Sequence, residues 1–259
     1  MLRLSNIKIR INEAANIDAE QTVLRKKILS RLRIHEEELK GFTIVKKSVD
    51  ARKKEDIVYV YTVDIETSQE KKLLAIGEHK DLVQAPELIF QPVHKGSERL
   101  SERPVIIGTG PAGLFAGLIL ARNGYRPILF ERGRDVDART DSIHRFWKEG
   151  RLNSESNVQF GEGGAGTFSD GKLTTLINDT RCSLVLKEFT AAGAPQEILY
   201  SSKPHIGTDL LKGVVKNLRQ DIIAHGGDVR FNARVTDFII EGGQLKALII
   251  NNRETIKCN

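Results

Sequence analysis

Apolar and polar positions alternate near the start of the chain, as they do in a strand with one buried face. Residues 7–11 show this alternation with three isoleucines. Leucine and isoleucine then recur every four residues over 24–32, which predicts one apolar face of a helix. We expect this helix to begin at Asp18, capped by that side chain, with Gln21 at the capping-box position.

Two more strands are expected over 41–49 and 56–66, joined by a charged hairpin connection. The order strand, helix, strand, strand predicts a small α+β domain over 1–92, ferredoxin-like if residues around 81–88 contribute to a second helix and strand. A polar stretch with proline near each end, 93–104, is typical of a linker.

The second domain-sized segment, 105–259, opens with a strand–turn–helix pattern. The apolar run 105–107 is followed directly by the turn Gly108-Thr109-Gly110-Pro111-Ala112-Gly113. In a GxGxxG turn, Gly108 permits the sharp bend, Gly110 lets the backbone approach a pyrophosphate, and Gly113 lets the helix pack closely on the strand. This predicts a Rossmann-type α/β domain that binds a dinucleotide.

The helix that follows and the next strand supply two further parts of such a site. The first amide groups of the helix point their N–H bonds toward the phosphates. Glu131 ends the second strand, where a carboxylate can accept hydrogen bonds from ribose hydroxyls. An acid at this position disfavours a 2′-phosphate, so NADP is not expected here.

The pattern becomes irregular after Glu131 and regular again near residue 208. A helix is expected there, capped by Thr208 or Asp209, with an apolar stripe over 210–222 and an end at Gly226-Gly227. Strands are expected over 228–240 and 245–251.

A second glycine-rich loop lies between these regions, at 161–172. Its glycines allow backbone N–H groups to converge on an anion or a planar ring, and Thr167, Ser169 and Lys172 can add donors. The alternative is a flexible surface loop. Flanking phenylalanines favour ligand contact, because a surface loop usually carries more serine and proline.

Composition narrows the class of protein. The 259 residues carry a formal charge of +6, and no apolar run has the length of a membrane span. The start of the chain lacks the apolar core of a signal peptide, so a cytoplasmic location without membrane contact is expected. Cys182 and Cys258 are far apart and form no CxxC, which argues against a flavin disulfide reductase. No spacing typical of a metal site is present.

The individual charged candidates leave alternatives open. His205 has a side chain suited to acid–base catalysis, but it equally suits a structural position before a helix. Arg132 and Arg139 flank the ribose acid and can bind phosphate or cover a helix face.

At this point the sequence resembles a known family. The segments GTGPAGLFAGLILARNG, LFERG and NVQFGEGGAGTFSDGKL are similar to those of a bacterial family of uncharacterised FAD-dependent dehydrogenases, within the glutathione-reductase-type flavoproteins. Lys203–Thr208 and Val45–Lys54 also look like family segments. By this resemblance the chain corresponds to the N-terminal half of such an enzyme, with an incomplete FAD-binding domain.

The resemblance implies FAD as the cofactor, held at the ribose by Glu131. It also implies that Gly163, Gly164, Thr167 and Ser169 lie near the pyrophosphate and flavin. By the same analogy, Val235 meets adenine through its backbone. These assignments come from the resemblance and not from spacing.

The expected function is that of an FAD-dependent oxidoreductase, which passes hydride or electrons between an unknown small-molecule substrate and FAD. NAD(P)H or another electron donor or acceptor is a possible second partner. Two alternatives stay open. One is an NAD-binding dehydrogenase without flavin, which should show more strand–helix repeats after Glu131. The other is an inactive docking module or an RNA-binding module, suggested by basic stretches that acidic residues interrupt.

Overall fold

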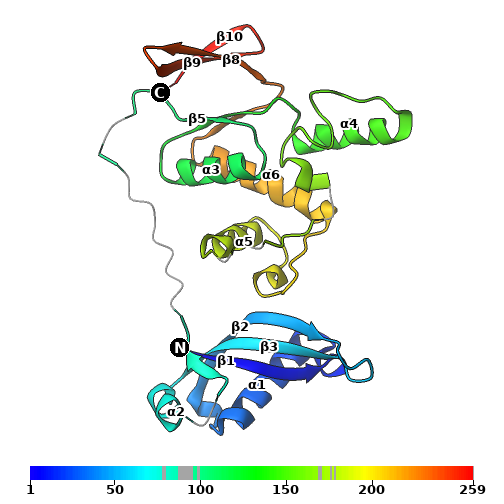
Figure 1. Ribbon diagram of the computed structural model, residues 1–259, viewed down its shortest axis with the longest axis vertical. Coiled ribbons are helices and arrows are strands. Elements are labelled where there is room, and N and C mark those ends of the chain that lie inside the picture. Colours follow the sequence, from blue (N-terminus) through cyan, green and yellow to red (C-terminus); the bar gives the residue numbers. More distant parts are fainter. Residues whose placement is uncertain are drawn as a thin grey trace. The chain divides into compact units, whose positions relative to one another are not determined.

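The computed structural model describes residues 1–77, 80–86, 96–97, 100–168, 171–175, 177 and 179–258. The chain divides into two compact units (Figure 1). The first unit comprises Met1–Phe90, Leu173–Leu186 and Gln196–Pro204. The second comprises Gln91–Lys172, Lys187–Pro195 and His205–Asn259.

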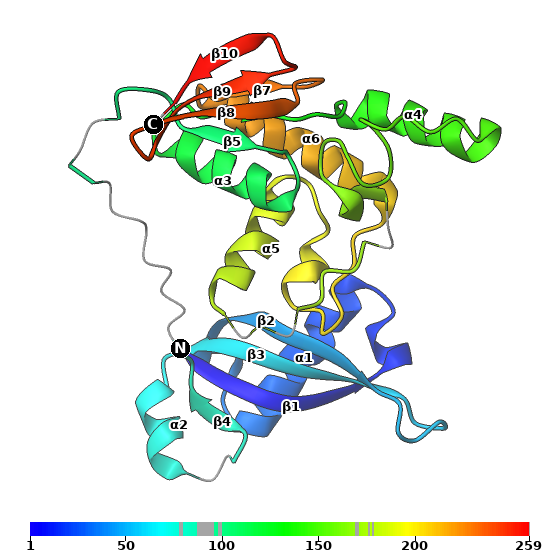
Figure 2. The same ribbon diagram turned by 45° about the horizontal axis from the view of Figure 1, so that its top comes forward.

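The first unit is an antiparallel sheet with a long helix across one face (Figure 2). Its strands lie in the order β2-β3-β1-β4, and every pairing is antiparallel. The elements in chain order are β1 (Leu2–Arg10), α1 (Ile17–Leu32), β2 (Leu39–Asp50), β3 (Val58–Thr67), α2 (Glu70–Ile76) and β4 (Leu82–Gln84), with short 3₁₀ helices at Ile11–Ala14, Glu36–Glu38 and Gln196–Leu199.

Helix α1 forms where the four-residue repeat predicts a buried stripe, and Leu24, Ile28 and Leu32 are buried against the sheet. Its start differs from the expectation. The cap is Asn16, whose side chain accepts a hydrogen bond from the Ala19 N–H at 2.8 Å. Asp18 lies inside the first turn, where its negative charge interacts favourably with the positive end of the helix dipole.

The second unit carries a three-stranded parallel sheet in the order β5-β6-β7 and a three-stranded antiparallel sheet in the order β10-β9-β8. Helices α3 and α6 pack side by side (Figure 2). The elements in chain order are β5 (Val105–Ile107), α3 (Pro111–Arg122), β6 (Ile128–Phe130), α4 (Val136–Glu149), a 3₁₀ helix (Ala165–Phe168), α6 (Thr208–Ala224), β7 (Asp228–Arg230), β8 (Val235–Glu241), β9 (Gln244–Ile250) and β10 (Glu254–Lys257). Helix α5 (Arg181–Ala191) is divided between the units, with residues 181–186 in the first and 187–191 in the second.

Glycines bring α3 close to its neighbours. A Cβ built on Gly113 would lie 2.0 Å from the carbonyl oxygen of Gly108, so the helix rests directly on the backbone of the turn. A Cβ on Gly117 would lie 2.8 Å from Leu129 of β6 and 3.2 Å from Ile222 of α6. These contacts hold the start of α3 firmly at the carboxyl end of β5.

Two local expectations in this unit are wrong. Helix α6 is capped by Gly207, which makes no side-chain cap, whereas Thr208 and Asp209 are already helical. The segment expected as one strand over 228–240 is two, β7 and β8, in different sheets. The break occurs at Asn232, whose φ of 52° turns the chain and whose carbonyl accepts a hydrogen bond from the Asn251 side chain.

None of the helices within the described ranges is both long and apolar enough to cross a membrane.

Candidate functional site

The turn between β5 and α3 is open on the side that faces away from the strand. Gly108 has a φ of 92°, and its N–H donates to the Phe130 carbonyl at 2.7 Å. Gly110 caps the helix, and a Cβ built on it would meet no atom within 4 Å. Pro111 starts the helix, so the N–H groups of Ala112 and Gly113 in its first turn have no intrahelical acceptor. The open space above Gly110 therefore faces the N–H groups of Ala112 and Gly113, at the positive end of the α3 helix dipole.

Glu131 is buried directly beside this turn. Its Oε2 accepts hydrogen bonds from both the N–H and the hydroxyl of Thr109, each at 2.9 Å. Its Oε1 accepts one from the Gly133 N–H at 2.8 Å. The side chain is 5% exposed, and three neutral donors stabilise its charge. The carboxylate is thus fixed in position before any ligand arrives.

The segment after β7 lies alongside this acid. The Ala233 N–H donates to the backbone carbonyl of Glu131 at 2.9 Å, and the Asn232 N–H donates to that of Gly133 at 2.8 Å. These bonds place the first residues of β8 next to the end of β6. Val235, expected near adenine, lines the same cleft as Glu131.

The second glycine-rich loop docks onto the first. The Gly163 N–H donates to the Thr109 carbonyl at 2.8 Å. A Cβ on Gly164 would lie 3.1 Å from Pro111 Cδ and 3.4 Å from Gly110 Cα, so the two backbones are in contact. Gly163 has a φ of 83°, and a Cβ there would lie 2.0 Å from Thr167 Oγ1. The Thr167 hydroxyl is buried and has no hydrogen-bond partner among the residues that the structure describes.

Arg139 of α4 holds this loop in place. Its buried guanidinium donates to backbone carbonyls of the loop, with distances of 2.6 Å to Glu162, 2.9 Å to Gly164 and 2.9 Å to Val158. Burial lowers the pKa of Arg139 to about 10, against the opposing charges of Glu131 and Glu162, so the group stays charged at neutral pH. The structure thus gives Arg139 the role of a loop anchor.

Glu162 is a second buried charge in the loop. Its Oε2 accepts a hydrogen bond from the Val136 N–H at the start of α4, at 2.7 Å. Arg219 Nε lies 3.3 Å from Oε1 but is not aligned for a hydrogen bond. Burial raises the pKa of Glu162 to about 7, although the Val136 N–H and Arg219 both lower it.

These parts enclose a cleft of about 340 Å³, within the size range of small-molecule sites. At its rim, Arg132 pairs with Glu155 at 2.8 Å and lies over the Phe160 ring at 4.2 Å. Arg234 reaches the same Glu155 at 3.4 Å. The lining residues are Ile107, Gly108, Gly110, Phe130, Glu131, Arg132, Gln159, Phe160, Gly161, Gly164, Ala233, Arg234 and Val235.

The expected site residues fall into groups. Those that line the cleft are Gly108, Gly110, Glu131, Arg132, Gly164 and Val235. Pro111, Ala112 and Gly113 form the first turn of α3 beside it, and Gly163 and Thr167 lie in the docked loop. Ser169 lies outside the described residues.

His205 is exposed and lies opposite Lys172 in an isolated antiparallel β-bridge. In the part of the chain that the structure describes, no carboxylate accepts a hydrogen bond from its ring. The group that would orient a catalytic histidine is therefore not seen, and no catalytic role is assigned to His205.

Sequence reasoning missed three residues that shape the cleft. Thr109 was given no role beside the glycines of the turn, yet its N–H and hydroxyl both donate to Glu131. Phe160 lies inside the segment NVQFGEGGAGTFSDGKL, and Arg234 directly precedes Val235. The phenylalanines that flank the glycine-rich loop favoured ligand contact, but Phe160 was not named as a site residue.

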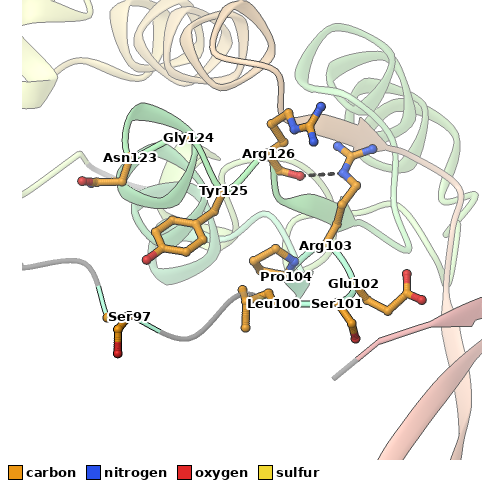
Figure 3. Close-up of a pocket in the computed structure, with 11 residues that line it drawn as sticks. Ser97, Leu100, Ser101, Glu102, Arg103, Pro104, Asn123, Gly124, Tyr125 and Arg126 are labelled. Atoms are coloured by element: carbon orange, nitrogen blue, oxygen red, sulfur yellow. Dashed lines mark hydrogen bonds between the residues drawn. The ribbon is translucent and has the colours of Figure 1, made fainter.

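Another cavity, of about 430 Å³, lies at the amino end of β5 (Figure 3). Arg103 crosses its wall and donates to the Arg126 carbonyl at 2.6 Å. Tyr125 and Leu100 also line it. It is at the opposite end of the strand from Gly108, so it is separate from the cleft around Glu131. Among the described residues, no group of three or more histidine, cysteine or acidic side chains could hold a metal ion.

Sequence comparison gives relatives without a known activity. Residues 1–66 match a family described as "Domain of unknown function (DUF8436)". An uncharacterized protein of Clostridium beijerinckii is 48% identical over 252 residues, which are 97% of this chain and 46% of that protein. The chain therefore spans about half the length of this curated relative.

Comparison with solved structures finds distant likenesses. A structure of THI4 from Thermovibrio ammonificans is 20% identical, with a TM-score of 0.36 over 58% of this chain and 47% of that one. Glycine oxidase from Bacillus cereus is 14% identical, with a TM-score of 0.39 over 61% of this chain and 53% of that one. At these scores the likenesses carry no weight for function, which is inferred below from the cleft itself.

Proposed function

We propose that this chain binds FAD along the cleft beside Glu131 and forms the flavin-binding part of an oxidoreductase. The observation that carries the proposal is the docking of the second glycine-rich loop onto the first, through Gly163 and Gly164. A dinucleotide site built only for NAD needs the first loop alone. The second loop brings the half-buried Gly164 against Pro111, and the exposed residues 165–166 follow it, where a flavin would continue.

The geometry fits the adenosine and diphosphate half of the cofactor. The open space over Gly110 faces the first N–H groups of α3, which suit a diphosphate. Among the described residues, only the Gly133 N–H donates to Oε1 of Glu131, so this oxygen retains a lone pair for a ribose hydroxyl. The cleft volume of about 340 Å³ is small, so we assign it to this half of FAD rather than to the whole molecule.

Each part of the chain would then have a distinct task. Glu131 would orient the ribose, the start of α3 would neutralise the diphosphate charge, and Val235 would meet the adenine edge. Arg132 and Phe160 would cover the outer face of the nucleotide at the rim. The bound flavin would supply the redox chemistry, and the protein would supply binding and orientation.

The domain assignment is part of the same proposal. In the first unit, the element order β-α-β-β-α-β and the sheet order β4-β1-β3-β2 support a ferredoxin-like domain. In the second unit, the parallel strands β5, β6 and β7 with α3 support an FAD-binding Rossmann-type domain that further strands would complete. We infer a small-molecule substrate, NAD(P)H or another electron carrier as its redox partner, and a cytoplasmic location.

A titration of the purified chain tests the cofactor assignment. FAD, NAD and ADP are each added while heat or flavin fluorescence is followed. The proposal expects saturable FAD binding, competition by ADP because it shares the adenosine diphosphate half, and weaker binding of NAD. Binding of NAD at least as tight as that of FAD would overturn the flavin assignment. No binding of any of the three by a folded chain would overturn the site in this chain.

A further inference from the structure

A partly buried ion pair lies between α1 and the sheet of the first unit. Lys47 of β2 is opposite Tyr61 of β3, so its side chain is on the face that α1 covers. Its Nζ donates to Glu20 Oε2 of α1 at 2.8 Å. The Lys47 ammonium also lies over the ring of Tyr59, 4.4 Å from the centroid, and 5.5 Å from that of Tyr61.

The polar groups around this pair are largely shielded from solvent. Glu20 is 6% exposed, and in the described part of the chain neither its Oε1 nor the Tyr61 hydroxyl has a hydrogen-bond partner. Burial, followed by the charge of Glu20, raises the pKa values of Tyr61 and Tyr200, so both phenols keep their protons. The end of the core of this unit therefore holds an ammonium with phenol groups around it, where apolar packing would be the usual arrangement.

A segment remote in the sequence completes the enclosure. The Lys47 N–H donates to the Tyr200 carbonyl at 2.7 Å, and the Ser202 N–H donates back to the Lys47 carbonyl at 2.9 Å. The Ser202 hydroxyl donates to the same carbonyl at 2.9 Å. These bonds hold residues 200–202 alongside β2. Lys203, the next residue, therefore lines the same cavity as Lys47.

Between the segment and the sheet is a cavity of about 480 Å³. Two ammonium groups, those of Lys47 and Lys203, and two phenol rings, those of Tyr59 and Tyr200, belong to its wall, together with the single carboxylate of Glu197. Lys203 is exposed and forms no ion pair within the described ranges. Lys47 uses one of its three N–H bonds on Glu20, so it retains donors for a ligand.

We propose that this cavity is a second binding site, specific for a small planar aromatic carboxylate. The two ammonium groups would bind the carboxylate as point charges. The two tyrosine rings would bind the planar ring by stacked or edge contacts. This site lies within the first unit, so it is independent of the nucleotide cleft and of the flavin assignment.

Three related compounds test separately whether the site recognises the carboxylate charge and whether it recognises the planar ring. Benzoate, benzamide and cyclohexanecarboxylate are titrated separately into the whole chain, and the amide signals of residues 47 and 200–203 are followed by NMR. Loss of the charge in benzamide should weaken binding about tenfold or more. Loss of the planar ring in cyclohexanecarboxylate should weaken it about twofold to tenfold. Equal affinity for all three, or no saturable shift with benzoate, would overturn the proposal.

Variants of the wall give a second test. Lys203→Gln removes an exposed charge and should weaken benzoate binding about tenfold. The double variant E20Q/K47Q removes both members of the partly buried pair at once, which avoids leaving one charge without a partner, and should have a similar effect. Lys46→Gln is the matched control, because Lys46 is exposed on the opposite face of the same strand. Unchanged binding by Lys203→Gln would contradict the site even if the double variant did not fold.

Discussion

Thr109 fixes the carboxylate of Glu131 through two hydrogen bonds of 2.9 Å, one from its N–H and one from its hydroxyl. Thr109 lies between the first two glycines of the turn, so the glycine turn and Glu131 are joined directly. Preorganisation of this kind reduces the ordering that a ligand must impose when it binds. It also makes the acid part of the fold as well as part of the site.

Glu131→Gln should weaken FAD binding about tenfold or more, since a carboxylate forms stronger hydrogen bonds to ribose hydroxyls than a neutral amide does. It should also lower the free energy of unfolding by about 1–3 kcal/mol, because the amide group would face an N–H that then lacks an acceptor. Calorimetric titration and denaturant unfolding measure the two effects. Glu149→Gln, at the exposed end of α4, is the control. An E131Q variant that binds FAD as the wild type does would contradict the assignment of the ribose acid.

Two glycines of the same turn should respond differently to alanine. Gly110→Ala meets open space at an ordinary backbone φ of −67°, so the free energy of unfolding should change little while FAD affinity falls about tenfold. Gly113→Ala would place Cβ 2.0 Å from the Gly108 carbonyl and should cost about 1–3 kcal/mol or more of stability. Thermal unfolding and FAD titration of both variants separate the effects. Full FAD affinity in Gly110→Ala would mean that no phosphate approaches there.

Arg139→Lys should loosen the second glycine-rich loop, because an ammonium cannot reach all the carbonyls that the guanidinium bridges. We expect a loss of about 2–4 kcal/mol in the free energy of unfolding and faster hydrogen exchange at the amides of Glu162 and Gly163. Arg145→Lys, exposed on the same helix, should show neither effect. Normal stability and exchange in R139K, with only FAD binding lost, would instead indicate direct phosphate contact.

Glu162 should make stability depend on pH near neutrality. Its pKa of about 7 in the folded chain exceeds its usual value of 4.5, so the folded state holds a proton that the unfolded state releases between these values. Stability is therefore fully present below about pH 4.5 and falls as the pH rises through 7, by up to about 3 kcal/mol.

Glu162→Gln has no proton to lose and should remove this decline. Denaturant unfolding of both proteins at about pH 5 and about pH 8 measures it, since the difference between the two proteins should change between these values. If the free energies of unfolding of the wild type and of Glu162→Gln changed by the same amount over that range, Glu162 would not titrate there.

The strand, turn and helix that open the second domain were predictable because their signals are local. The strand, glycine turn and helix from Val105 to Arg122 follow from spacing alone, and so does the buried stripe of α1. The glycine turn needs small residues at fixed close spacing, and the buried stripe of α1 needs apolar residues every three or four positions. Both requirements can be read from a short stretch of sequence. The caps of α1 and α6 were mistaken, since several polar residues competed for each position and tertiary packing selected among them.

The contacts between remote segments were not predictable. Nothing in the spacing indicates that Arg139 binds the carbonyls of residues 157–164, or that residues 200–202 lie beside Lys47. The split at Asn232 also depends on a side chain of Asn251, nineteen residues later. Such pairings arise from the packing of whole elements, which a periodic pattern in one segment does not encode.

A crystal structure of the chain soaked with FAD tests the central claim most directly. The account predicts a ribose hydroxyl within hydrogen-bond distance of Glu131 Oε1 and a pyrophosphate at the N–H groups of Ala112 and Gly113. It also predicts that the diphosphate continues toward the flavin along Gly163 and Gly164. Density for the cofactor away from these groups, or a diphosphate that does not touch the start of α3, would contradict it.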